Sequence, residues 1–162
     1  MVAIITGGTR GIGLGIAKEL LKNDYSVILT ARNEGSAVAG LKAQYGDKVH
    51  FLSCDISDEN DINKLVSFAR EKYGKIQLLV NNAGVAPKER KDILEITGED
   101  FDYVTDINLK GTFFVTQKVT PLLIKNEKSR IVNISSMSSY TASINRGECN
   151  ALRFDCENIV EM

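Results

Sequence analysis

Three glycines near the N-terminus have a spacing that could hold a phosphate group. Gly7, Gly11 and Gly13 belong to the stretch TGGTRGIG at residues 6–13, between an apolar run and a segment with helical periodicity. Residues with no Cβ let the backbone approach a ligand closely. The unpaired N–H groups and the dipole of a first helical turn favour an anion. The stretch therefore predicts a phosphate-binding turn, and a tight turn without a ligand is the alternative.

The elements that would position this turn alternate between short apolar runs and longer periodic segments. We expect strands at residues 2–5, 26–30, 49–53, 77–81 and 130–134. We expect helices at residues 11–23, 35–45 and 58–73, and a further helix capped by Thr97 that is broken near Asn108 and runs to about residue 126, with Pro121 at a kink or turn boundary. Residues 85–96 read as a surface loop. This alternation predicts an α/β fold, a Rossmann-type doubly wound parallel sheet with five strands.

In such a sheet a ligand lies at the carboxyl ends of the strands, where the strand order reverses. Small or polar residues follow every predicted strand at this position. They are the glycine turn, Ala31-Arg32-Asn33, Cys54-Asp55-Ile56, Asn82-Ala83-Gly84 and Ser135-Ser136. Their regular placement predicts a dinucleotide lying across the strand ends.

Composition and charge exclude several other classes of protein. The formal net charge is −1 and the basic residues are scattered, which argues against a nucleic-acid or anionic membrane surface. No apolar run approaches the roughly 20 residues that span a bilayer, and we expect no signal peptide. The three cysteines form no CxxC pair and His50 is the only histidine, so we expect free thiols in a reducing cytoplasm and no metal site.

Five motifs together resemble those of the short-chain dehydrogenases/reductases. They are the TGxxxGxG pattern at 6–13, Asp55, Asn81-Asn82-Ala83-Gly84, Asn108 in its INLKG context, and Ser135-Ser136 after the last strand. Among members of this family the chain is most similar to bacterial 3-oxoacyl-(acyl carrier protein) reductases. The resemblance covers residues 1–148, the expected dinucleotide-binding Rossmann domain, and residues 149–162 form a divergent tail.

The resemblance implies a nicotinamide dinucleotide as cofactor. The cofactor-binding positions would be Gly7, Thr9, Arg10, Gly11, Ile12, Gly13, Arg32, Asp55, Ile56, Asn82, Ala83 and Gly84. No acid ends the second strand, and Arg10 and Arg32 could both reach a 2′-phosphate, which favours NADP over NAD. The alternative is that both arginines are ordinary surface charges. Asp55 would accept a hydrogen bond from the adenine amino group, and it could also form a turn or helix cap.

The same resemblance implies a catalytic role for two residues. Ser136 matches the family serine that polarises the substrate carbonyl, and Asn108 matches the asparagine that holds a water in the proton relay. Asparagine is disfavoured inside helices, so Asn108 at a helix break calls for such a role. We expect Asn81 to tie neighbouring strands together instead.

The family pattern breaks after the serine. A Tyr-x-x-x-Lys motif should follow about thirteen residues later, but that position is Cys149, the last lysine is Lys128, and Tyr140 reads as a loop residue. The family's last strands are also missing, so the fold is expected to be truncated, through a frameshift, a premature stop or a shortened isoform. The exposed edge of the fifth strand would then favour a homo-oligomer.

Two functions are compatible with these observations, and a third reading is a folding fragment with neither activity. By lineage the chain is an NADP(H)-dependent oxidoreductase that acts on a small-molecule carbonyl or alcohol. The alternative is a dinucleotide-binding fragment without turnover, because a positioned acid contributes roughly 10²–10⁴-fold to such a reaction and the family's acid is absent.

Overall fold

Five parallel strands form one sheet in the computed structural model, which describes residues 1–136. The strands are β1 (Val2–Thr6), β2 (Ser26–Ala31), β3 (Val49–Ser53), β4 (Leu78–Asn81) and β5 (Arg130–Asn133). Their order across the sheet is β3-β2-β1-β4-β5. The direction of winding therefore reverses between β1 and β4. The expected Rossmann-type doubly wound sheet is confirmed.

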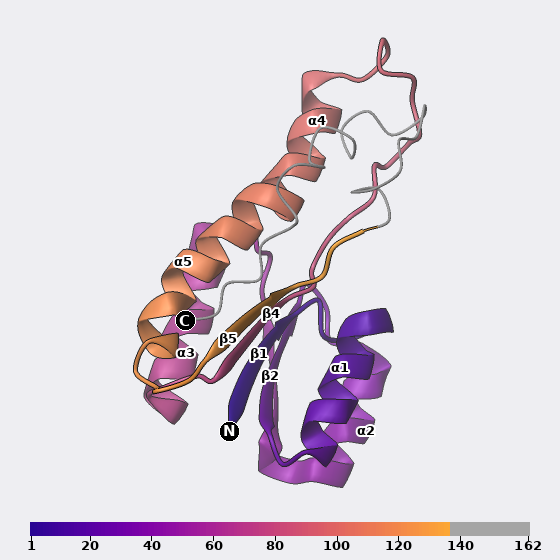
Figure 1. The fold of residues 1–162 in the computed structure, drawn as a ribbon. Helices are drawn as coiled ribbons and strands as arrows, with labels where there is room; N and C mark the ends of the chain where they lie inside the picture. Colours follow the sequence, from indigo (N-terminus) through magenta and orange to yellow (C-terminus); the bar gives the residue numbers. More distant parts are fainter. Residues whose placement is uncertain (137–162) are drawn as a thin grey trace.

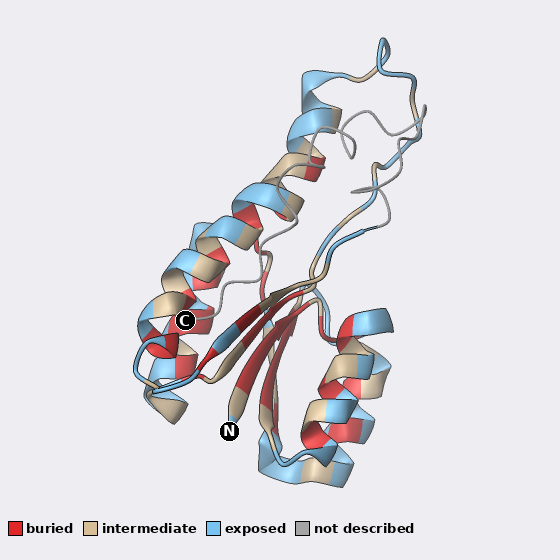
Figure 2. Ribbon diagram, in the orientation of Figure 1, coloured by how far each residue is buried: buried red, intermediate tan, exposed pale blue. Residues whose placement is uncertain are grey.

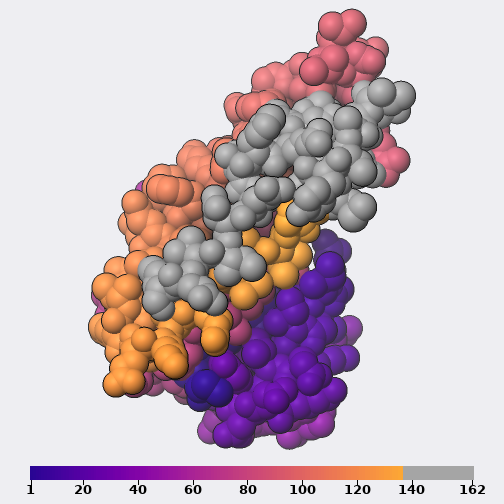
Figure 3. All heavy atoms as spheres, in the orientation of Figure 1, coloured from indigo at the N-terminus to yellow at the C-terminus, as the bar shows by residue number. Residues whose placement is uncertain are grey.

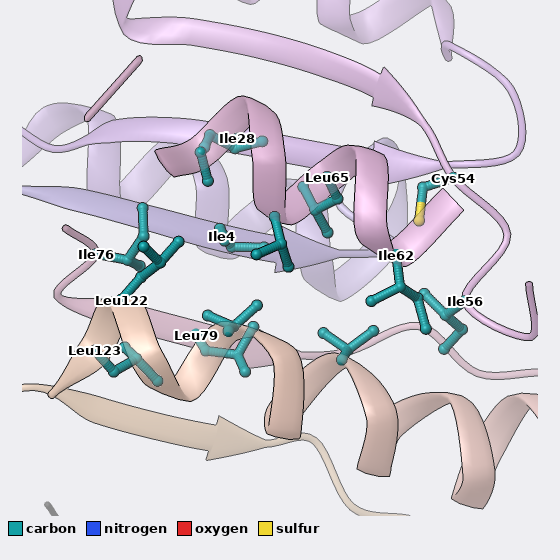
Figure 4. Packing of buried hydrophobic residues seen from close by; sticks show 14 of the residues in the cluster. Ile4, Ile28, Cys54, Ile56, Ile62, Leu65, Ile76, Leu79, Leu122 and Leu123 are labelled. Carbon is teal, nitrogen blue, oxygen red and sulfur yellow. The ribbon is translucent and has the colours of Figure 1, made fainter. Parts of the chain in front are cut away.

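The central strands are apolar on both faces, because helices cover the sheet from both sides (Figure 1). Successive residues alternate between two cores. Ile4, Ile28 and Leu79 face one cluster, in which they pack with residues of α3 (Glu59–Tyr73) and α5 (Thr112–Leu123) (Figure 4). Their neighbours Ile5, Leu29 and Val80 face the second cluster, and Figure 2 shows the central strands as mostly buried.

The second face is covered by α1 (Gly11–Lys22) and α2 (Ser36–Tyr45). Ala17 and Leu21 of α1 and Val38 and Leu41 of α2 supply its buried side chains. A short 3₁₀ turn, η1 (Gly46–Lys48), then leads into β3. In the space-filling view of Figure 3 this N-terminal part, in indigo, lies on one side, and α5 and β5, in orange, lie on the other.

The last helical segment is broken where the sequence predicts. Helix α4 (Gly98–Thr105) begins at a capping box, in which Thr97 and Asp100 exchange hydrogen bonds. A π-helical segment, η2 (Asp106–Gly111), separates α4 from α5 and contains Asn108. Pro121 lies in the last turn of α5, which ends at Leu123 rather than near residue 126. A proline there removes one helical hydrogen bond and marks the approaching end of the helix.

Residues 1–136 contain neither a helix that could span a membrane nor a cluster of metal-binding side chains. None of the helices in this part of the chain is long and apolar enough to cross a membrane. No group of three or more His, Cys, Asp or Glu side chains in it could hold a metal ion. The divergent tail, 149–162, and the residues 137–148 before it lie outside the part that the structure describes.

His50 on β3 makes the stability of this fold depend on pH. Its ring centroid lies 5.5 Å from that of Phe68 and 6.0 Å from that of Tyr73, and its buried Nε2 has no hydrogen-bond partner among the described residues. Burial, and then the charge of Lys72, lowers the pKa of His50 below its ordinary value of 6.5. Since protonation is then easier in the unfolded chain, we expect the free energy of unfolding to fall as pH drops below about 6.5.

Urea unfolding of wild type and His50→Gln between pH 5 and 8 measures this contribution. The wild-type chain should lose stability toward pH 5 more steeply than the variant, which has no proton to take up at this position. Identical pH dependence of the two proteins would show that His50 titrates equally in both states.

Candidate functional site

A cleft of about 290 Å³ opens at the carboxyl ends of the central strands, where the winding of the sheet reverses. Eleven of the twelve predicted cofactor-binding residues line it, and Gly13 does not. The full lining is Gly7, Thr9, Arg10, Gly11, Ile12, Thr30, Ala31, Arg32, Cys54, Asp55, Ile56, Asn82, Ala83, Gly84, Val85 and Ile107. The four segments that follow β1, β2, β3 and β4 therefore meet in one cavity.

The glycine turn presents open backbone to this cleft. Gly11 has φ +53°, and a Cβ at this position would meet no described atom outside its immediate neighbours within 4 Å. It is the first residue of α1, whose N-cap, Arg10, gives no side-chain hydrogen bond to the first turn within residues 1–136. The first turn of α1 also contains no acidic residue. Its N–H groups and the helix dipole are thus free to receive an anion.

Gly7 and Gly13 are required for a different reason, which is the closeness of Asn82. A Cβ on Gly7 would lie 2.9 Å from Nδ2 of Asn82, and Gly7 itself has φ +64°. A Cβ on Gly13 would lie 2.5 Å from the same nitrogen and 2.5 Å from the carbonyl oxygen of Gly7. Gly13 is therefore buried beneath the turn, where it lets the helix and the turn close on the Asn82 amide.

Asn82 and Thr6 join the ends of β1 and β4. The Asn82 side chain donates to the carbonyl oxygens of Thr6 and Gly7 at 2.9 and 3.0 Å. The Thr6 hydroxyl in turn accepts from the backbone N–H groups of Asn82 and Ala83, both at 3.0 Å. The side chain of Asn82 is thus committed to the backbone of the glycine turn, and Asn82 supports that turn as well as lining the cleft.

Two guanidinium groups lie at the end of the cleft near β2. Arg10 and Arg32 are both exposed, and neither forms an ion pair with any residue of the described part. The first acid after β2 in the sequence, Glu34, is paired with Lys42 at 2.6 Å and is not among the cleft-lining residues. This end of the cleft therefore has positive charge, with no carboxylate directed to it from the β2 loop.

Asp55 lines the cleft after β3, and hydrogen bonds from Ser57 hold its carboxylate in place. One oxygen, Oδ1, accepts from the backbone N–H and the hydroxyl of Ser57 at 3.0 and 2.7 Å. Beside it, burial, and then the charges of Asp61 and Asp55, raises the pKa of the Cys54 thiol to about 12. Cys54 is thus a neutral, apolar part of the wall and not a reactive thiolate.

Asn108 is held by a pair of hydrogen bonds from the η2 segment to the loop after β4. Its side chain accepts from the N–H of Val85 at 2.8 Å and donates to the Val85 carbonyl at 2.9 Å. It lies directly over Gly84, whose Cβ would be 3.3 Å from Oδ1 of Asn108. The Asn108 amide therefore orders the β4 loop, and the water-holding role implied by the resemblance stays a prediction.

Asn81 links strands, as its sequence context predicts. Its Nδ2 donates to Oδ1 of Asn133 on β5 at 2.8 Å and to the hydroxyl of Thr116 on α5 at 2.9 Å. Ser136 lies three residues beyond β5, is exposed, and is not among the residues that line the cleft. Tyr140 and Cys149 lie outside the described residues.

Val85 and Ile107 line the cleft without having been predicted from the sequence. Val85 directly follows Gly84, and Ile107 directly precedes Asn108, so a wider window around the two motifs would have included both. Thr30, Ala31 and Cys54 lie beside predicted residues and also line the cleft. Ile107 gave no signal in the sequence, because an apolar residue there is equally typical of the core.

The packing of Gly13 predicts a sharp contrast between two substitutions in α1. Gly13→Ala should destabilise the chain by about 1–3 kcal/mol, because its methyl group would overlap the Asn82 amide and the Gly7 carbonyl. Gly15→Ala is the matched control, since a Cβ there meets no described atom beyond its own helix within 4 Å. It should stabilise α1 by about 0.5–1 kcal/mol. Urea unfolding measures both, and equal effects would contradict this role of Gly13.

Known proteins are similar to this chain in both sequence and fold. The chain matches the family model of the short chain dehydrogenases over residues 1–148. It is 37% identical over 142 residues to dehydrogenase/reductase SDR family member 4 of Caenorhabditis elegans, a match that covers 86% of this chain and 54% of that protein. It is 38% identical over 167 residues to carbonyl reductase [NADPH] 3 of Mus musculus, covering 99% and 58%.

A solved structure agrees with these matches. The crystal structure of the Brucella melitensis 3-oxoacyl-[acyl-carrier protein] reductase in complex with NAD superposes with a TM-score of 0.84 at 37% identity. It covers 94% of this chain and 62% of the Brucella chain. The chain thus spans little more than half the length of the relatives that it matches. The glycine turn and the cleft at the strand ends are consistent with these matches. The family model and these relatives show that the chain belongs to the short-chain dehydrogenase family.

Proposed function

We propose that this chain binds NADP(H) across the carboxyl ends of its strands, as the cofactor-binding part of an oxidoreductase acting on a small-molecule carbonyl or alcohol. The observation that carries the proposal is the charge at the end of the cleft near β2. Arg10 and Arg32 are unpaired there within residues 1–136, and Glu34 is held away by Lys42. A carboxylate near β2 would favour a free 2′-hydroxyl, whereas two guanidiniums favour a 2′-phosphate.

The residues of the cleft fit the rest of a dinucleotide. Gly11 leaves room for a pyrophosphate beside the open first turn of α1. The Asp55 carboxylate, fixed by Ser57, would accept a hydrogen bond from the adenine amino group. Ala83 and Gly84, held in place by Thr6 and Asn108, would line the ribose and nicotinamide side.

The relatives support a nicotinamide dinucleotide and differ in which one. NADPH is part of the name of the mouse carbonyl reductase, whereas the Brucella reductase structure contains NAD. We therefore base the choice of NADP(H) on Arg10 and Arg32.

When bound, the cofactor would supply or accept the hydride of carbonyl reduction or alcohol oxidation. The Ser136 hydroxyl, just after β5, would donate a hydrogen bond to the substrate carbonyl oxygen. Asn108 would keep the β4 loop against the nicotinamide side through Val85. The thirteenth residue after Ser136 is Cys149 and no lysine follows Lys128, so the family's proton donor has no counterpart at its usual position. This absence favours the second candidate, cofactor binding without turnover.

Fluorescence titration with NADPH and NADH tests the cofactor. Wild type should bind NADPH more tightly. Arg32→Ala and Arg10→Ala should each raise the Kd for NADPH about tenfold or more, because each removes a charge-assisted hydrogen bond of about 1.5–3 kcal/mol. The Kd for NADH should stay nearly constant, which serves as the internal control. Comparable affinity of wild type for the two cofactors would contradict the choice of NADP(H).

A reduction assay on the same sample separates the two candidate functions. Oxidation of NADPH with a ketone or an acetoacetyl thioester, lost in Ser136→Ala while NADPH still binds, would support the oxidoreductase. Tight NADPH binding without any oxidation would support the binding module.

We also propose that the chain is cytoplasmic and forms a homo-oligomer. Cys54 is a free, buried thiol, as expected in a reducing compartment. Phe113 and Leu109 on the α5 side are 58% and 39% exposed, which is unfavourable for aromatic and aliphatic side chains in water. A monomer in light scattering at micromolar concentration would contradict the association.

A further inference from the structure

The loop after β2 approaches the glycine turn closely at a glycine, Gly35. Gly35 is the N-cap of α2 and has ordinary extended backbone angles, φ −72° and ψ 149°. A Cβ built on it would lie 3.0 Å from the carbonyl oxygen of Thr9 and 3.3 Å from the Thr9 Cβ. Any residue could adopt these angles, so it is the closeness of Thr9, and not the backbone conformation, that disfavours a side chain at this position.

The glycine turn is the side of this contact that is held in place. Thr9 is only 8% exposed. On its N-terminal side, the N–H of Gly8 donates to the carbonyl of Thr30 at 3.2 Å, and the carbonyl of Gly7 accepts from Asn82. A Cβ on Gly35 would therefore displace the β2 loop and leave the turn in place.

The start of α2 limits where this displacement can go. The N–H of Val38 donates to the carbonyl of Gly35 at 2.9 Å, and Val38 is fully buried against the sheet. The few residues between β2 and Gly35 would then move, and they include Arg32. Arg10 is next to Thr9, so the contact between Gly35 and Thr9 also sets the spacing between the segments that carry the two arginines.

We propose that Gly35 is a specificity-determining residue for the 2′-phosphate of the cofactor. Gly35 would be a positioning residue, because the absence of a side chain lets the loop that carries Arg32 lie directly against the turn that carries Arg10. Both guanidiniums can then reach one phosphate at the end of the cleft near β2. This inference rests on the proposed binding of NADP(H), and Gly35 itself need not touch the cofactor.

A small movement of the loop should weaken only the 2′-phosphate contacts. Charge-assisted hydrogen bonds from guanidinium groups are short, about 2.7–2.9 Å, and two of them on one phosphate depend on the relative position of the donors. A shift of a few tenths of an ångström in Arg32 would disturb that geometry. NADH has a hydroxyl group at the same position, so its affinity should depend much less on the spacing between Arg10 and Arg32.

The experiment compares Gly35→Ala and Gly35→Ser with wild type in titrations with NADPH and NADH. Both variants introduce the same Cβ, but serine is a good N-cap residue and alanine is a poor one. The Kd for NADPH should rise about three- to tenfold in both, and the Kd for NADH should stay within about twofold. Gly40→Ala is the control in the same helix, since its Cβ meets no described atom outside the helix within 4 Å. It should change neither affinity.

Thermal unfolding of the same variants shows whether the loss of NADPH affinity comes from a displaced loop or from a less stable protein. Gly35→Ser should unfold at the same temperature as Gly35→Ala or a higher one, yet lose a similar amount of NADPH affinity. Unchanged NADPH affinity, an equal loss for both cofactors, or affinity that simply follows stability would overturn the role of Gly35. If wild type binds neither cofactor, the proposed function itself is wrong, which the titration of wild type reveals separately.

Discussion

The junction between the ends of β1 and β4 is the constraint on which the candidate site depends. These strands are neighbours in the sheet but 72 residues or more apart in sequence, and their carboxyl ends meet where the winding reverses. Four hydrogen bonds among Thr6, Gly7, Asn82 and Ala83 join them. Each satisfies a backbone group that would otherwise be left without a partner as the chain leaves the sheet.

The open end of the cleft follows from this junction. The Asn82 amide occupies the space below the turn, and Gly7 and Gly13 have no side chains there to oppose it. The first turn of α1 is then presented to the cleft without a side-chain cap within residues 1–136. The Asn108 side chain orders the loop after β4 by bonding to the backbone N–H and carbonyl of Val85. The Asn82 side chain orders the glycine turn in the same way, by bonding to backbone carbonyls. Two asparagines thus order two of the segments that line the same cavity.

Much of the fold could be predicted because its central strands, β1, β2 and β4, are buried along most of their length. Short apolar runs indicated the strands, and the Thr97 cap and the break near Asn108 were also visible in the sequence. The end of α5 was placed too late, since residues 124–126 are compatible with a helix and only the tertiary structure ends it at Leu123. The π-helical form of the break and the close packing of Gly111, at its end, against the Ile56 carbonyl were not visible in the sequence.

The sequence predicted which strand ends form the candidate site, but it did not predict the contacts between their side chains and backbones. Sequence position placed Asn82 near the cleft, but its commitment to the Thr6 and Gly7 carbonyls depends on contacts across more than 70 residues. The pairing of Glu34 with Lys42, and the closeness of Gly35 to Thr9, were likewise invisible. The pairing of Glu34 with Lys42 bears on which charges remain free at the end of the cleft near β2.

Backbone hydrogen exchange with and without NADPH tests the central claim most directly, because it reports where on the chain the cofactor lies. The account predicts slower exchange in the segments after β1, β2, β3 and β4, around residues 7–13, 31–35, 54–57 and 82–85. Exchange in the middle of α5, on the other side of the sheet from α1, should stay unchanged. Protection absent from residues 7–13, or centred on α5, would contradict a dinucleotide held by the glycine turn.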